Sequence, residues 1–169
     1  MNVREKADAV GTFRFIEVRL METAAYWTPI TPEMEVKVLF GRHIWNFAQH
    51  ADWLGKRTFE LRQPEHYTRT PAGDYLELLN SLKEALTTAD RLGLLYDVVV
   101  PGLIRRYEAY LAATDHLLDE PSVVIIERIL GELRRQRQEA DQLRSSIGVP
   151  MTQIDAFAGR EFAISSVVA

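Results

Sequence analysis

The sequence of 169 residues contains no cysteine, which excludes disulfide frameworks, thiolate metal sites and thiol catalysis. It contains no run of about 18 or more apolar residues, so we expect no membrane-spanning segment. Lys and Arg number 20 against 24 Asp and Glu, which argues against a broad basic surface for nucleic acid. Charged residues are spread through the first 25 positions, so we expect no secretory signal and a cytoplasmic location.

What is present is an ordinary globular composition, with 47% hydrophobic and 26% charged residues. Four segments have apolar residues at steps of three and four, the spacing of a helix that buries one face. These segments are residues 4–27, 32–62, 74–114 and 120–145. Four such helices with short connections predict an all-α fold, a four-helix bundle.

Local signals set the expected helix boundaries. Thr31 is a plausible N-cap for the second helix, which is long enough to break at Gly41 or Gly55. Pro101 and Gly102 interrupt the third segment, so we expect a kinked third helix.

The chain divides into a helical bundle domain, residues 1–146, and a C-terminal tail, residues 147–169. The tail has no helical stripe, but its end is apolar enough to need a covering surface. We therefore expect an irregular tail that packs on the bundle or on a partner subunit, in a homo- or hetero-oligomer. The connection at residues 63–73 is long enough to cross along the bundle.

Three polar residues fall on the apolar stripes of the first two helices. Glu17 shares a face with Phe13 and Leu20, and a buried carboxylate protonates, pairs or binds a metal. His43 and His50 are seven residues apart and lie on the inner stripe of the second helix. A bundle-edge glutamate and ordinary core histidines are the alternative interpretation of these residues.

Antiparallel pairing extends this set to the fourth helix. A turn near residue 30 places Glu17 opposite His43, and Glu132 lies at about the depth of Glu17. Glu127 is a further candidate on the same helix. The sequence thus allows one inward constellation of candidate metal ligands. These are Glu17, His43, His50, Glu127 and Glu132.

Two stretches carry a resemblance to a known family. The runs EVKVLFGRHIWNFAQHAD, residues 35–52, and DEPSVVIIERILGE, residues 119–132, resemble helices of the ferritin-like superfamily. Together with the inward Glu17, the resemblance covers about residues 5–143. It implies a ferritin-like bundle in which Glu and Glu-x-x-His residues bind two iron or manganese ions.

The sequence departs from that ligand pattern. Phe47 stands three residues before His50, and Phe40 stands three residues before His43, so Glu-x-x-His is missing. Arg135 follows Glu132 at the position of a histidine ligand, and a guanidinium has no lone pair to donate. We therefore expect a degenerate metal site in a binding or structural subunit. The alternative is an iron- or manganese-dependent oxidase or oxygenase with an atypical Glu/His site.

A third hypothesis is a small-molecule pocket in the bundle, lined by Trp45, Phe47 and His50 and held open by a kink at Pro101. The arginines of the fourth helix alternate with acids, so we interpret them as a solvated face with ion pairs along the helix.

Overall fold

The computed structural model describes residues 1–168, and all of their regular structure is helical. The elements are α1 (Val3–Ile30), α2 (Met34–Glu60), α3 (Gly73–Ser81), the 3-10 turn η1 (Leu82–Glu84), α4 (Thr88–Leu92), the π-helical turn η2 (Gly93–Val99), α5 (Val100–Ala113), α6 (Glu120–Ile147) and α7 (Asp155–Ala163). The expected all-α class is confirmed. None of the helices in the described part of the chain is long and apolar enough to cross a bilayer.

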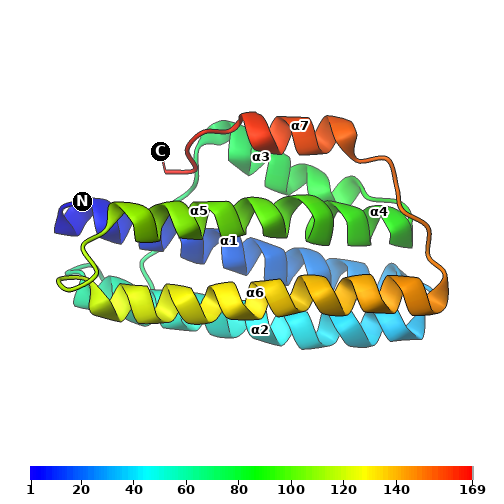
Figure 1. Ribbon diagram of the computed structural model, residues 1–169, viewed down its shortest axis with the longest axis horizontal. Helices are drawn as coiled ribbons and strands as arrows, with labels where there is room; N and C mark the ends of the chain where they lie inside the picture. The colour runs from blue at the N-terminus through cyan, green and yellow to red at the C-terminus, as the bar shows by residue number, and fades with distance from the viewer. Residues whose placement is uncertain (169) are drawn as a thin grey trace.

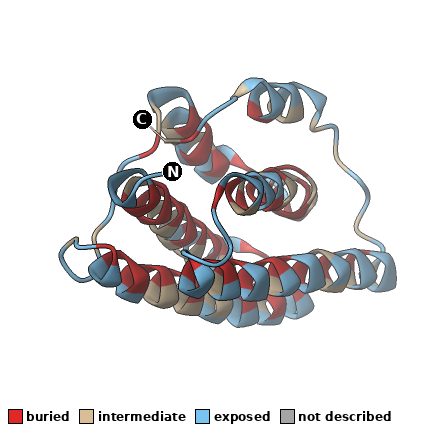
Figure 2. Cartoon of the chain, turned by 60° about the vertical axis from the view of Figure 1, so that its left-hand side comes forward, coloured by how far each residue is buried: buried red, intermediate tan, exposed pale blue. Residues whose placement is uncertain are grey.

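The helices form a bundle with two shorter helices on one side. α4, η2 and α5 follow each other without a break and make one rod over residues 88–113. This rod runs along the same axis as α1, α2 and α6, while α3 and α7 lie beyond α5 (Figure 1). Buried residues line the inner faces of the long helices (Figure 2). Aromatic residues fill much of this core, including Trp27, Phe40, Tyr75, Tyr96 and Tyr107, all 0% exposed.

α1 and α2 differ from the expected boundaries. Asn2 and Glu5 form a capping box that begins α1, and the helix continues through Pro29 to Ile30. The prediction of Thr31 as an N-cap is wrong, because its hydroxyl donates to the Trp27 carbonyl at 2.8 Å and closes α1 instead. α2 runs without a break past both of its glycines.

The third segment is not one helix. Residues 85–87 separate η1 from α4, and Thr87 and Asp90 form a second capping box that restarts the chain. The π-helical turn η2 then leads into Pro101. The Val100 amide bonds the Leu95 carbonyl, but Pro101 has no N–H for the Tyr96 carbonyl. Arg137 of α6 supplies that bond from its Nε at 3.1 Å.

The tail packs on its own bundle. The expectation of an irregular tail is wrong over α7, although Ala169 lies outside the described residues. Glu161 is the only buried residue of α7, and its carboxylate bonds Arg105 and Arg106 of α5. The Ala72 amide donates to the Val167 carbonyl at 3.0 Å. A helix that contacts the bundle through one ion-paired acid and the partly buried Phe157 has no continuous apolar stripe, which is why the sequence pattern missed it.

Candidate functional site

His50 of α2 lies at the centre of a buried polar network. Its Nδ1 is 3.1 Å from Oε2 of Glu17 on α1, and its Nε2 is 3.0 Å from Oε2 of Glu132 on α6. The imidazole is 0% exposed. An ionised carboxylate only accepts hydrogen bonds, so the ring satisfies both neighbours only by donating from both nitrogens. The partners therefore assign His50 as an imidazolium.

The network has one residue from each of the long helices α1, α2, α5 and α6. The second oxygen of Glu17, Oε1, accepts a hydrogen bond of 2.8 Å from the hydroxyl of Tyr107 on α5. Glu132 has 15% of its side chain exposed, whereas Glu17 is fully buried. The polar chain thus runs from the surface of α6 through α2 and α1 to α5.

Trp53 and Arg128 cover the outer side of His50. The Trp53 ring centroid is 5.8 Å from that of His50, and the Arg128 guanidinium lies 4.0 Å above the indole. Arg128 Nε is also 3.4 Å from Oε1 of Glu132. This stack limits the access of water to the ion pairs, which strengthens them.

The electrostatics agree with the geometry. Burial opposes the charge on His50, but the charges and hydrogen bonds of Glu17 and Glu132 outweigh it and raise the pKa of the imidazole. Burial raises the pKa of Tyr107 far above its ordinary value, and the neighbouring Glu17 carboxylate raises it further. The phenol therefore stays protonated and keeps donating to Glu17.

His43 forms a second network one heptad away. Its Nδ1 is 2.7 Å from the hydroxyl of Tyr96 in η2, and its Nε2 is 3.1 Å from Oε2 of Glu139 on α6. A neutral ring satisfies both partners, with Nε2–H donating to Glu139 and Nδ1 accepting from Tyr96. Burial lowers the pKa of His43, and Arg42 and Arg135 lower it further against the opposing effect of Glu139.

Four of the five expected site residues take part in the two networks, and the fifth does not. Glu17, His43 and His50 are buried, and Glu132 reaches His50 from α6. Glu127, by contrast, is exposed on the outer face of α6, so the expectation that it points inward is wrong.

The expected contact between Glu17 and His43 is also wrong, because Glu17 meets His50. The residue numbers of this pair have their midpoint between 33 and 34, and so do those of the neighbouring Trp27 and Phe40, whose rings pack at an interplanar angle of 39°. The turn was expected near residue 30. α1 continues through Pro29, which moves the pairing by about one heptad.

Sequence reasoning missed Tyr96, Tyr107 and Glu139. One usable signal was present: Glu132 and Glu139 are seven residues apart, as are His43 and His50. On antiparallel helices equal spacings bring the two pairs together, each histidine beside one glutamate. The tyrosines had no such signal, because their positions depend on η2.

Gln136 lies on α6 between Glu132 and Glu139. Its side chain is 0% exposed, and within residues 1–168 neither Oε1 nor Nε2 has a hydrogen-bond partner. A buried amide without partners destabilises a fold unless water or a ligand meets it.

The donor set does not fit a metal ion in this arrangement. The two carboxylates of the first network contact opposite nitrogens of one ring, so they do not converge on a point. Within residues 1–168 no group of three or more His, Asp or Glu side chains is placed to hold a metal. An imidazolium also has no lone pair for coordination.

The pocket expected around Trp45 is not formed by those residues. Trp45 is 64% exposed on the outside of α2, whereas Phe47 and His50 are fully buried. The space beside Gly102 is filled by the carboxylate of Glu161, which a Cβ at this position would overlap.

No protein-family model, no curated protein and no solved structure matches this chain.

Proposed function

We propose that this chain is a ferritin-like helical bundle with a degenerate metal site, which acts as a structural or binding subunit. One observation carries the proposal: both nitrogens of His50 are held by carboxylates, from Glu17 and Glu132. In a ligand set of the ferritin-like type the imidazole donates a lone pair to iron or manganese. Here the same residue types form a closed ion-pair network across the core.

The residues that replace the missing ligands support this interpretation. Phe47 and Phe40 stand where Glu-x-x-His requires an acid, and both are 0% exposed apolar core residues. Without those acids, the histidines contact carboxylates of α1 and α6. Each network closes on a tyrosine hydroxyl, through Glu17 in one case and through His43 in the other. The chemistry of the site is then to hold protons in place and keep water out.

Metal analysis tests the core of the proposal. Protein expressed with added iron and manganese should retain less than about 0.1 equivalent of either metal per chain, the level of an incomplete ligand set. Its melting temperature should not change with Fe(II), Mn(II) or a chelator. A stoichiometric metal that is lost in His50→Asn would overturn the proposal.

The alternative is an iron- or manganese-dependent oxidase or oxygenase that uses Glu17, His43, His50 and Glu132. It is favoured by the burial of Glu17, His43 and His50, by the contact of Glu132 with His50, and by the unpartnered amide of Gln136 on the same helix as Glu132. It requires His50 to lose a proton and release one carboxylate. Oxygen consumption by the iron-loaded protein, compared with His50→Asn, tests it.

The proposed subunit role rests on the outer face of α2. Met34, Val38 and Trp45 are 57–66% exposed and recur on one face, together with Gly41. Nothing lies within 4 Å of a Cβ built on Gly41, so this side of α2 has a bulky ring next to open space. In an antiparallel pair of α2 helices, each Trp45 fits over the Gly41 of the other copy. A two-fold dimer has this reciprocity, so a second copy of the chain is the occupant we propose.

The mass of the particle in solution tests the dimer. The wild type should have twice the mass of one chain by light scattering, and Trp45→Ser should halve it with unchanged circular dichroism. Phe162→Ser is the matched control, because Phe162 is 77% exposed on α7 rather than α2. A wild-type monomer at high concentration would contradict this arrangement.

A further inference from the structure

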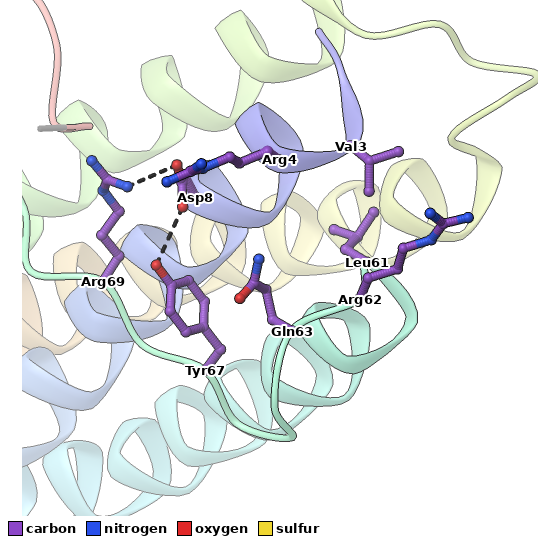
Figure 3. A pocket seen from close by; sticks show the side chains of 8 residues that line it. All are labelled: Val3, Arg4, Asp8, Leu61, Arg62, Gln63, Tyr67 and Arg69. Carbon is purple, nitrogen blue, oxygen red and sulfur yellow. Dashed lines mark hydrogen bonds and ion pairs between the residues drawn. The ribbon is translucent and has the colours of Figure 1, made fainter.

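A polar pocket lies where α1 begins and the chain leaves α2, outside the histidine networks. Its volume is about 480 Å³. Its polar lining consists of Arg4, Asp8, Arg62, Gln63, Tyr67 and Arg69. Figure 3 shows Arg69 on one side, Arg62 on the other, and the Gln63 amide between them.

The pocket has more positive than negative charge. Three guanidiniums line it against one carboxylate, although the whole chain has a net charge of -4. Asp8 is used by Arg69, at 2.7 Å, and accepts a hydrogen bond of 3.2 Å from the Tyr67 hydroxyl (Figure 3). The side chains of Arg4 and Arg62 make no hydrogen bond or ion pair with any of residues 1–168, and both residues are exposed. Two guanidiniums therefore remain for an anion.

Neither of these two arginines is favoured by its local structure. Arg62 has a φ of 65°, in the left-handed region, at the position after α2 where glycine is preferred. The backbone N–H of Gln63 donates to the Thr58 carbonyl at 3.1 Å, which fixes this turn. Arg4 lies in the first turn of α1, where a cation is repelled by the helix dipole. Residues that break local rules are expected at functional sites.

The wall of the pocket is held rigidly against α1 and α2. The Arg69 amide donates to the Gly11 carbonyl at 3.2 Å, and the Tyr67 ring lies 2.8 Å from where a Cβ of Gly11 would be. The His66 amide donates to the Gly55 carbonyl at 3.2 Å. The segment that has Tyr67 and Arg69 is thus fixed before any ligand arrives, which reduces the entropy lost on binding.

We propose that this pocket binds a phosphate monoester. In Figure 3 the Arg4 side chain reaches toward Asp8 and Arg62 lies on the opposite side of the pocket, so both exposed guanidiniums turn inward to pair with the phosphoryl oxygens, whose geometry Arg forks match. The side-chain amide of Gln63 donates a further hydrogen bond. The cavity is larger than a phosphate ion needs, and the Tyr67 ring and Leu61 give the remaining part an aromatic and apolar wall for the organic group. This site is independent of the function proposed above.

Calorimetric titration with phenyl phosphate tests the site. The wild type should bind phenyl phosphate more tightly than inorganic phosphate, and sulfate or phenol at matched ionic strength should bind weakly. Arg62→Gly should weaken binding about tenfold or more and also raise the melting temperature, because glycine relieves the left-handed backbone. Arg4→Gln should weaken binding with no loss of melting temperature.

Arg160→Gln is the control, since it removes one exposed arginine from α7 and should leave binding unchanged. Equal affinity in the wild type, Arg4→Gln and Arg62→Gly would overturn the proposal, as would equal affinity for phenyl phosphate and sulfate. No heat of binding from the folded wild type would also overturn it. None of these results depends on the metal content or the oligomeric state, so the two proposals can fail separately.

Discussion

The two histidines of α2 have the same chemistry and opposite protonation. Each is fully buried and each contacts one glutamate of α6. They differ in the group at Nδ1: Glu17 for His50, and the hydroxyl of Tyr96 for His43. A carboxylate at Nδ1 requires a protonated nitrogen and hence a charged ring. A phenol that donates to Nδ1 requires a lone pair on that nitrogen and hence a neutral ring. One partner on a neighbouring helix therefore decides the charge of a buried ring.

The largest contrast should come from removing each ring. His50→Leu leaves Glu17 buried without a cation and should lower the free energy of unfolding by about 3–5 kcal/mol. His43→Leu leaves a hydroxyl and a partly exposed carboxylate and should cost about 1–3 kcal/mol. Urea denaturation of the two variants measures the difference. Equal losses would mean that His50 is not charged in the folded state.

Much of the comparison could be predicted from the sequence, but its decisive part could not. Periodicity places Glu17, His43 and His50 inside, because apolar spacing reports which face of a helix is buried. The pairing of Glu17 with His50 depends on where α1 ends, and the helix continues past the expected end at residue 27 to Ile30. The role of Tyr96 depends on the π-helical turn, which precedes Pro101 and whose Tyr96 carbonyl accepts a hydrogen bond from the distant Arg137. Such tertiary contacts leave no periodic signal.

Removing the hydroxyl of each tyrosine should show the same difference between the two networks, with smaller losses of unfolding free energy. Tyr107→Phe removes a hydrogen bond to an ionised carboxylate and should cost about 1.5–3 kcal/mol. Tyr96→Phe removes a bond between neutral groups and should cost about 0.5–1.5 kcal/mol. Both changes delete one hydroxyl from a fully buried ring, so each variant is the control for the other. Thermal unfolding at pH 7 compares them, and the reverse order would argue for a charged His43.

Stability should depend on pH in opposite directions at the two sites. The pKa of His50 is raised above 6.5, so its contribution is complete below pH 6.5 and is lost as pH rises through the raised value. The pKa of His43 is lowered, so its contribution is complete above pH 6.5 and is lost as pH falls through the lowered value.

Unfolding free energies from pH 4 to 9 measure both effects. His50→Gln should flatten the alkaline side of the profile, and His43→Gln should remove part of the acid side. Identical profiles for the two variants would show that the rings titrate alike.

The smallest effect is expected at Gln136, which lies on α6 between the two networks. Gln136→Leu removes a buried amide without partners and should change the free energy of unfolding by less than about 1 kcal/mol, towards greater stability. Chemical denaturation measures this, and Leu133→Ala, which should lose about 2–5 kcal/mol, verifies that the assay detects core changes. A clear destabilisation by Gln136→Leu would reveal a bound water or ligand at the amide.

The π-helical turn η2 determines which face of α5 points into the bundle, because α5 follows η2 directly on the same rod. A π-helical turn is an α-helix with one additional residue, and each residue turns an α-helix by about 100°. Deleting one residue between 93 and 99 would therefore rotate α5 about its own axis by about 100° and move the hydroxyl of Tyr107 away from α1. A proline, an arginine on α6 and an acid on α1 are coupled in this way, although they are distant in the sequence.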